Sequence, residues 1–468
     1  MSFTEYLLDI VSTTLGAIPL RVFGHDTQEF VNYPFIDEIF HLRQTQAYCD
    51  GDWGYWDPKI TTPPGLYYLG AAYNILTDGS CDLSSLRSLN FIGGLVLALI
   101  AFYLRIKVDN AGFTSLSIFM NPLVAIYYSL FYTDVWSAVF AVASYAIAAT
   151  TPFKSDYLTA SISAALGLIS VTFRQTNIVW TAFAMIALLD AISKRDEHPY
   201  TKTVSDQIKS IVSVSLKNWL LLIPYLADAI LFANFILYNG SITLGDKGNH
   251  QVTFHLMQLL YCSTFIAIFT VPLWFSLDLF KNYFKDNLLS TRGLLFNAVW
   301  IPVLAVVVQN FTIIHPFLLA DNRHYTFYLV RRFIIRDEMS KYELLPVYHF
   351  ACYVIWDFIK QSAEDSESSS NSSLAMFFAL ICSTALTIIP SPLFEPRYFI
   401  LPFIFFRLLI KPSSKPIVNI SWLRENNWAT RLVLEAVWEW LWTQAIYIIF
   451  LTYSFMWETE EYPQRIIW

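Results

Sequence analysis

Long apolar runs recur along almost the whole chain, and they constrain its fold more than any other feature. Because a membrane crossing takes about 20 apolar residues, candidate spans lie at 4–22, 86–105, 113–131, 135–150, 157–173, 177–192, 218–238, 253–279, 293–311, 344–360, 374–390, 397–411 and 432–455. Of the 468 residues, 55% are hydrophobic and only 14% are charged, so a polar surface cannot cover these runs. We predict an all-α polytopic membrane protein, a single transmembrane domain over 1–468 with about 12–14 transmembrane helices.

Basic residues predict which loops face the cytosol. When the spans alternate, one side collects the following residues: Arg105, Lys107, Lys194, Arg195, Lys202, Lys209, Lys217, Lys281, Lys285, Arg292, Lys411, Lys415, Arg424 and Arg431. The opposite face then receives a long first loop, 23–85, a second segment, 312–343, several short turns and the tail after 456. Two features depart from this pattern. Glu5 before the first span and Arg21 after it favour the reverse orientation, and residues 323–341 carry five basic side chains. That stretch is either a cytosolic loop or a set of cations with a function on the other face.

Net charge and cysteine spacing exclude some classes of protein. The formal net charge of −7 argues against a nucleic-acid partner. The five cysteines include no CxxC pair, which argues against a structural zinc site. Cys49 and Cys81 both lie in the first loop. They could form a disulfide if this loop faces an oxidising compartment, or remain two thiols.

The first loop contains the densest group of chemically active side chains. Asp37 and Glu38 are adjacent carboxylates, and His41 lies one helical turn after Asp37. A carboxylate can act as general base toward a sugar hydroxyl, and a nearby cation can hold a phosphate. Other interpretations remain open at this point: Asp37 as a helix cap, Glu38 and His41 as solvated loop residues, or a metal site built from all three.

Several longer strings carry a resemblance to a known family. They are the following: Asp37-Glu38-Ile39-Phe40-His41 with Gln44; Trp56-Asp57-Pro58-Lys59-Ile60-Thr61-Thr62-Pro63-Pro64-Gly65; Phe173-Arg174-Gln175-Thr176-Asn177; His315-Pro316-Phe317-Leu318-Leu319-Ala320-Asp321-Asn322-Arg323-His324-Tyr325; and Arg397-Tyr398-Phe399-Ile400-Leu401-Pro402. Together they resemble the eukaryotic alpha-1,2-glucosyltransferases of the endoplasmic reticulum that use dolichyl-phosphate glucose. Pro63-Pro64 departs from the single proline that is typical of that family.

The resemblance implies a GT-C glycosyltransferase fold in the endoplasmic reticulum membrane, with a lumenal active site and no metal or other cofactor. The implied partners are dolichyl-phosphate glucose, the diglucosylated lipid-linked oligosaccharide and membrane lipid. Asp37 is the first candidate for the base and Glu38 the second. Candidates for the donor phosphate are Arg397, Arg323, His324, His41 and Lys59, and candidates for the acceptor or the cleft are Trp56, Asp57, Asp134, Arg174 and Gln175.

Alternative interpretations of residues and function remain. Trp53, Tyr55 and Trp56 could stack on sugars or lie in an interfacial aromatic belt. Arg174 and Asp134 could pair with each other or line the cleft. Another dolichyl-phosphate-sugar-dependent enzyme, such as a mannosyltransferase, would share the acidic loop. A transporter, flippase or channel regulator would instead bury charges in the middle of its spans.

Overall fold

The computed structural model describes residues 3–108, 112–196, 203–365, 373–417 and 427–468, and these residues are mostly helical. In the first half of the chain the helices are α1 (Phe3–Phe30), α2 (Glu38–Cys49), α3 (Gly65–Thr77), α4 (Leu83–Lys107), α5 (Ser115–Phe119), α6 (Pro122–Ala125), α7 (Asp134–Thr150), α8 (Asp156–Val171), α9 (Asn177–Asp196), α10 (Val204–Lys217) and α11 (Ile223–Asn239).

The second half continues this pattern. Its helices are α12 (Met257–Phe269), α13 (Val271–Trp274), α14 (Leu277–Phe284), α15 (Thr291–Phe311), α16 (Pro316–Ala320), α17 (Tyr325–Leu329), α18 (Ser340–Glu343), α19 (Leu345–Asp365), α20 (Leu374–Ile388), α21 (Ile400–Leu409) and α23 (Asn427–Thr452). Short helical turns are η1 (Ile126–Ser129), η2 (Trp219–Leu222), η3 (Lys285–Leu289), η4 (Val330–Ile334) and η5 (Pro396–Phe399). Strands β1 (Ser454–Phe455) and β2 (Gln464–Arg465) pair antiparallel.

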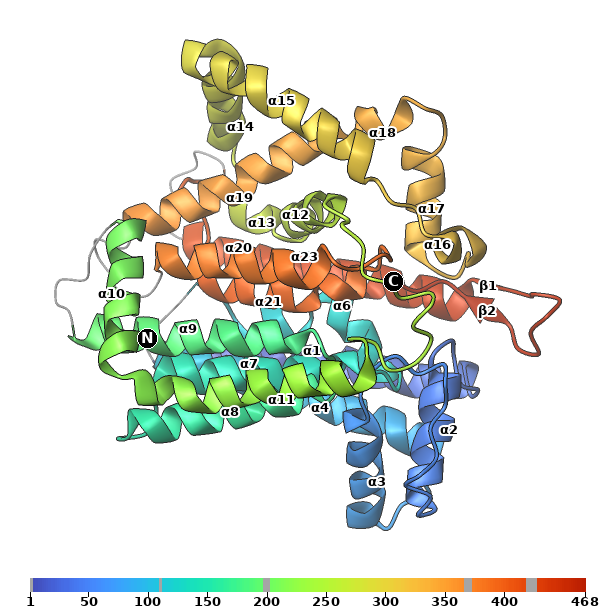
Figure 1. The fold of residues 1–468 in the computed structure, drawn as a ribbon. Coiled ribbons are helices and arrows are strands. Elements are labelled where there is room, and N and C mark those ends of the chain that lie inside the picture. Colours follow the sequence, from blue (N-terminus) through green and yellow to red (C-terminus); the bar gives the residue numbers. More distant parts are fainter. Residues whose placement is uncertain (1–2, 109–111, 197–202, 366–372, 418–426) are drawn as a thin grey trace.

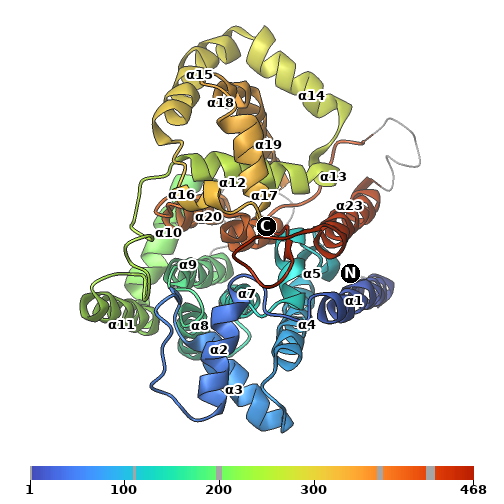
Figure 2. The ribbon, with the colours of Figure 1, turned by 90° about the vertical axis from the view of Figure 1, so that its right-hand side faces the viewer.

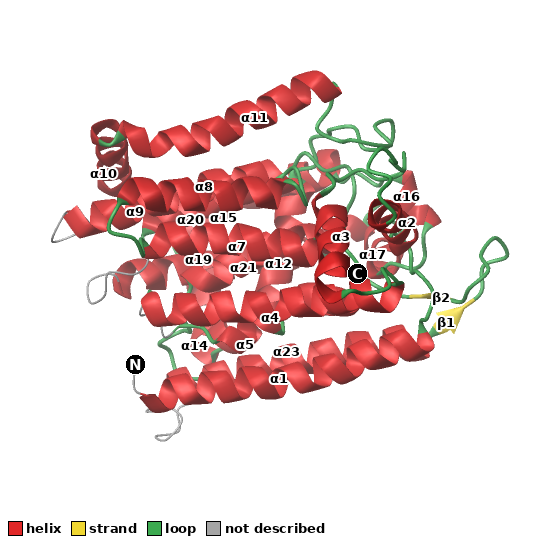
Figure 3. Cartoon of the chain, turned by 90° about the horizontal axis from the view of Figure 1, so that it is seen from below, coloured by secondary structure: helices red, strands yellow, loops and turns green. Residues whose placement is uncertain are grey.

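The long helices run roughly parallel in one bundle (Figures 1 and 3). One end of the bundle, called the loop end below, carries α2, α3, α16, α17 and the β-hairpin, whereas α10, α14 and the N-terminus lie at the opposite end (Figure 1). Segments 31–82, 240–256, 312–344, 389–399 and 453–468 connect or follow helices at the loop end. The first loop and segment 312–343, both predicted to lie on the face opposite the cytosol, are therefore at the same end of the bundle.

Length and composition identify the helices that can cross a membrane. Six described helical segments are long and apolar enough: Tyr6–Phe30, Leu83–Lys107, Asn177–Asp196, Trp219–Asn239, Thr291–Phe311 and Asn427–Thr452. Shorter apolar helices cover Asp134–Thr150, Asp156–Val171, Met257–Phe269 and Leu374–Ile388. Outward apolar side chains such as Leu8, Leu231 and Val299 are more than half exposed, as expected where lipid covers them. The prediction of an all-α polytopic membrane protein is confirmed.

Several predicted boundaries differ from the structure. The expected span 253–279 is divided into α12, α13 and the start of α14. The expected span 113–131 is broken into α5, α6 and η1. Asn121 interrupts it, because its side chain accepts a hydrogen bond from the Leu123 amide and Pro122 begins the next turn. Helix α1 continues to Phe30, so Arg21 lies within the first helix rather than after it, and the first loop begins at Val31 instead of residue 23.

The structure also bears on the two cysteines of the first loop and on the basic residues predicted for the cytosolic side. Cys49 and Cys81 form a disulfide that ties the end of α2 to the start of α4. Two members of the predicted basic set are buried: Arg105 pairs with Asp9 at 2.8 Å, and Arg431 donates to the carbonyl of Pro272 at 2.7 Å. Lys202 and Arg424 lie outside the described residues.

Candidate active site

Two adjoining cavities occupy the loop end. The wide cavity, of about 540 Å³, is lined by residues from the first loop, the 312–343 segment, the turn before α21 and the tail. The narrow cavity, of about 190 Å³, lies beside α7, α9, α20 and α21 and is lined partly by the apolar side chains of Trp180, Val252 and Leu401. The residues that line both cavities are Thr61, Thr62, Arg174, His250, Arg397 and Tyr398. Segments more than 300 residues apart in the sequence therefore form one site.

Asp37 lines the wide cavity, and one arginine holds its carboxylate there. It occupies the N-cap position of α2, but its side chain makes no capping hydrogen bond. Its Oδ2 instead accepts a hydrogen bond from Arg397 Nη1 at 3.1 Å, and the carboxylate side chain is 36% exposed. Asp37 therefore turns its carboxylate toward the cavity rather than toward its own helix.

Glu38, the second predicted candidate for the base, does not line either cavity. Its side chain is fully buried. Oε1 accepts from Arg87 Nε at 2.9 Å and from the Phe131 amide at 2.6 Å, and Oε2 accepts from the Phe35 amide at 2.9 Å. Four donors, counting a second nitrogen of Arg87, surround this carboxylate, so the geometry opposes a role as base. The adjacent carboxylates divide into one that faces the cavity and one that fixes the loop.

Charge and burial act on the pKa of Asp37 in opposite directions. Burial raises the pKa of this carboxyl, but the positive charge facing it, chiefly that of the Arg397 guanidinium, outweighs burial and holds the pKa below its ordinary value. Burial lowers the pKa of His41, and Asp37 only partly offsets that effect. At neutral pH the site therefore holds an ionised Asp37 beside a neutral His41.

The other predicted residues of the first loop separate into two groups. His41 lines the wide cavity, and its Nδ1 is 2.9 Å from the Tyr67 hydroxyl; Lys59 is exposed at the cavity wall. Trp56 and Asp57, predicted to line the cleft, line neither cavity. Trp56 packs edge-on against Tyr67, and the buried Asp57 accepts from the Lys59 amide at 2.9 Å. Both residues pack within the first loop and lie outside the walls of these two cavities, so their place in the cleft stays a prediction.

Arg397 lies where the two cavities join. Besides its bond to Asp37, its Nε forms an ion pair with Glu395 Oε2. Burial raises the pKa of Glu395, but Arg397 again outweighs burial, so this carboxyl also has a lowered pKa. Two carboxylates therefore hold one guanidinium at the junction.

Arg174, Asp134 and Gln175, which were predicted for the cleft, line the narrow cavity. Arg174 Nη2 donates to Asp134 Oδ1 at 2.7 Å, and the guanidinium lies 5.6 Å from the ring centroid of Tyr398. Pairing and cleft lining, offered as alternatives by the sequence, are therefore both present. The second oxygen of Asp134 and the Nε of Arg174 are buried without a partner, so both side chains keep hydrogen-bonding capacity within the site.

Loop contacts around Gln175 close this part of the site. Its Nε2 donates to the carbonyls of Thr61 and Ile242 at 2.6 and 3.1 Å, joining the first loop to segment 240–250. Gly245 lets the two backbones approach, since a Cβ there would come within 2.3 Å of the Pro58 carbonyl oxygen.

Arg323 and His324 also line the wide cavity. The distribution of basic residues in the sequence had left open which side of the membrane this segment faces. Arg323 Nη2 donates to Asp321 Oδ2 at 2.7 Å and Nη1 donates to Gln464 Oε1 at 3.0 Å. His324 Nδ1 lies 2.8 Å from the main-chain oxygen of Trp468. Both residues thus share the cavity of Asp37. Arg331, Arg332 and Arg336 line neither cavity.

Several lining residues were not singled out from the sequence. Glu395, His250, Trp457 and Trp468 all line a cavity. Glu395 stands two residues before Arg397, and a carboxylate that close to a predicted phosphate ligand was a detectable signal. The tail tryptophans had none, because 15 tryptophans are spread along the chain and only tertiary structure selects among them.

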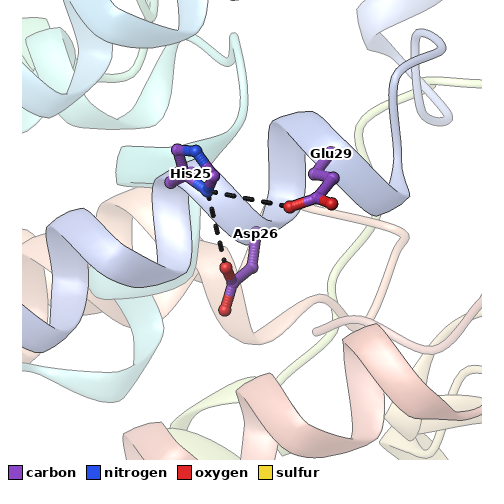
Figure 4. Close-up of side chains that lie close together, drawn as sticks. All are labelled: His25, Asp26 and Glu29. Atoms are coloured by element: carbon purple, nitrogen blue, oxygen red, sulfur yellow. Dashed lines mark ion pairs between the residues drawn. The ribbon is translucent and has the colours of Figure 1, made fainter.

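A possible metal-ligand group lies elsewhere. Within the described ranges, one group of three or more potential ligands comes close enough together: His25, Asp26 and Glu29, on neighbouring turns of α1 (Figure 4). His25 Nδ1 lies 3.7 Å from Asp26 and 3.9 Å from Glu29; the side chains of His25 and Glu29 are largely exposed, and that of Asp26 is partly buried. Asp37, Glu38 and His41 do not form such a group.

Fold and site together define a polytopic helical membrane protein with a charge-lined cavity at one end, in which an ionised carboxylate pairs with an arginine beside a partly apolar recess. Comparison with known proteins makes this class specific. The model of the DIE2/ALG10 family matches residues 31–408, and the chain belongs to that family.

Similar proteins share nearly the whole length of the chain. It is 38% identical over 453 residues to a Debaryomyces hansenii protein named Dol-P-Glc:Glc(2)Man(9)GlcNAc(2)-PP-Dol alpha-1,2-glucosyltransferase, with 94% of each chain covered. Proteins of the same name from Mus musculus and Arabidopsis thaliana are 32% and 30% identical. The matches cover 93% of both chains for mouse, and 97% of this chain and 98% of the relative for Arabidopsis. No solved structure matches the chain.

Proposed function

We propose that this protein transfers glucose from dolichyl-phosphate glucose to the diglucosylated oligosaccharide Glc2Man9GlcNAc2 on dolichyl pyrophosphate, forming the terminal alpha-1,2 linkage. The site would face the lumen of the endoplasmic reticulum, in a GT-C type of membrane glycosyltransferase. The observation that carries the proposal is the ionised Asp37 at the junction with Arg397, inside a cavity large enough for sugars. The shared name of the full-length relatives supports the substrates.

The chemistry requires one base. Asp37 takes the proton of the acceptor 2-hydroxyl while that oxygen attacks the anomeric carbon of the donor. The bond from this carbon to the phosphate oxygen breaks, and dolichyl phosphate leaves as an anion. Because a phosphate needs no proton to leave, no second carboxyl is required, in contrast to glycoside hydrolases. With a beta-linked donor, a single displacement gives an alpha linkage.

The donor phosphate fits best at the junction of the two cavities. Arg397 and Arg174 both line it, and arginine can bind phosphate through two parallel hydrogen bonds. The first isoprene units of the carrier would then lie along Trp180, Val252 and Leu401 in the narrow cavity. A phosphate that shares Arg397 weakens its hold on Asp37. The pKa of that carboxyl rises, and Asp37 becomes the stronger base when donor is bound.

The proposal is tested with purified protein and synthetic lipids. We expect transfer of glucose from dolichyl-phosphate glucose, at least about tenfold faster at equal concentration than transfer of mannose from dolichyl-phosphate mannose, and a product with the alpha-1,2 linkage by NMR. Preferential use of the mannose donor would identify another dolichyl-phosphate-sugar-dependent enzyme. Lipid or solute transport that survives Asp37→Asn would support a transporter and contradict the proposal.

Replacement of Arg397 tests its assignment to the phosphate. Arg397→Gln should lower kcat/KM for the donor at least about 100-fold, because it removes a charge-assisted contact with the phosphate. The pKa of Asp37 should rise in this variant, since burial raises it and the opposing guanidinium is gone. The acid limb of the pH–rate profile therefore moves to higher pH. Arg292→Gln, an exposed change at the start of α15 that lines neither cavity, is the matched control and should match wild type. An unchanged donor KM together with an unchanged pH profile in Arg397→Gln would refute the assignment.

A further inference from the structure

Residues 454–468, called the tail segment below, form part of the wall of the wide cavity. Trp457, Ile467 and Trp468 line it, and the end of the chain lies near the middle of the loop end (Figure 2). The family model stops at residue 408, so this wall lies beyond the matched region. The mechanism proposed above uses Asp37, Arg174 and Arg397 and gives no role to the part of the cavity wall that the tail segment forms.

The tail segment is fixed at several points. The Tyr325 amide donates to the Ile467 carbonyl at 2.9 Å, and the Ile467 amide donates to the Arg323 carbonyl at 2.7 Å. The buried Arg465 donates to the Phe450 carbonyl at 2.8 Å. These bonds tie the tail segment both to segment 321–325 and to the end of α23. Its aromatic side chains consequently have defined positions relative to Arg323.

Trp457 contacts the polar side chains of Arg323 and Asn322. The Arg323 guanidinium lies 4.5 Å from the Trp457 ring centroid, and the indole N–H donates to Asn322 Oδ1 at 3.0 Å. Arg323 is paired with Asp321 and bonded to Gln464, so its charge is balanced by a carboxylate. This neutral combination fits a phosphate poorly. It fits a pyranose, whose C–H face packs on an aromatic ring while its hydroxyls bond to carboxylate and guanidinium groups.

We infer that Trp457, together with Asp321 and Arg323, forms the subsite for the terminal sugar of the acceptor oligosaccharide. The inference rests on the proposed function, because it assigns the acceptor side of the same cavity. Asp321, Arg323 and Trp457 line the wide cavity together with Asp37, whereas the donor junction lies around Arg174 and Arg397. Arg323 then positions the acceptor, and Trp457 determines specificity for a sugar with an accessible C–H face.

Steady-state kinetics with dolichyl-phosphate glucose and a synthetic diglucosylated acceptor test this subsite. Trp457→Ala should raise the acceptor KM about tenfold or more while the donor KM changes less than about twofold. Trp457→Phe keeps a ring and should give an intermediate acceptor KM. Met456→Ala is the matched control, because this neighbouring side chain is 63% exposed and does not line the cavity; it should behave as wild type.

Two results would overturn the subsite: an unchanged acceptor KM in Trp457→Ala, or equal increases in the donor and acceptor KM values. If Trp457→Ala does not fold, as judged by its elution in size-exclusion chromatography, Trp457→Phe and Asp321→Asn decide by the same two KM values. Failure of the proposed function is distinguishable. A wild-type protein that does not use dolichyl-phosphate glucose contradicts that function, whereas normal wild-type transfer with unaltered acceptor KM values in the variants contradicts only the subsite.

Discussion

Asp37→Asn should lower kcat for glucose transfer about 10²–10⁴-fold, the range expected when a general base is removed. Asparagine keeps the size of the side chain and an oxygen that can accept from Arg397, so the site should remain folded. The donor KM should stay level or fall, because a negative charge near the bound phosphate is removed. Loss of kcat without a rise in donor KM is the pattern of an interaction made in the transition state.

The pH dependence gives a second measurement on the same residue. Burial raises the pKa of Asp37, but Arg397 outweighs burial and holds it below its ordinary value. The carboxylate therefore stays ionised through the neutral range, and wild-type kcat/KM should show no acid limb from this group above about pH 5. Asp52→Asn, an exposed change in the same loop, is the control and should retain activity. Full activity of Asp37→Asn would reject the mechanism.

The helical class was readable from the sequence because a membrane crossing demands a length and composition that few other structures share. The broken segment 113–131 shows the limit of that reasoning. Its hydropathy is continuous enough for one span, yet Asn121-Pro122 ends one helix and begins another. The sequence contained this signal, and an average over the window concealed it.

Site residues could be predicted from the sequence where they belong to a family motif. They could not be predicted where tertiary contacts determine which side chain lines the cavity. The motifs brought together Asp37, Arg323 and Arg397, which line one cavity although up to 360 residues separate them. Nothing in the Asp37-Glu38 dipeptide tells which carboxylate faces the cavity. That choice depends on Arg87, 49 residues from Glu38. In the same way, the family motif points to Trp56 for the cleft, whereas the tryptophan that lines the wide cavity beside Arg323 is Trp457.

Loss of Glu38 should damage the fold more than the chemistry. Glu38 and Arg87 form an ion pair in which both side chains are at most 1% exposed, and Arg87 also donates to the Val31 carbonyl at 2.6 Å. Their contacts join α4, the start of the first loop and the backbone at Phe131. Glu38→Leu would leave a buried arginine without its counter-charge, a loss of about 3–5 kcal/mol in the free energy of unfolding.

A double-mutant cycle separates this role from catalysis. Glu38→Leu and Arg87→Met should each lower the apparent Tm strongly. The double variant should be more stable than the additive sum of the two by at least about 1.5 kcal/mol, because an apolar pair can replace a buried ion pair. The exposed Glu338→Gln is the control for loss of a carboxylate and should leave the Tm unchanged. If Glu38 were the base, the double variant would regain Tm without regaining kcat; recovery of both Tm and kcat in the double variant means that this carboxylate acts by holding Asp37 in place.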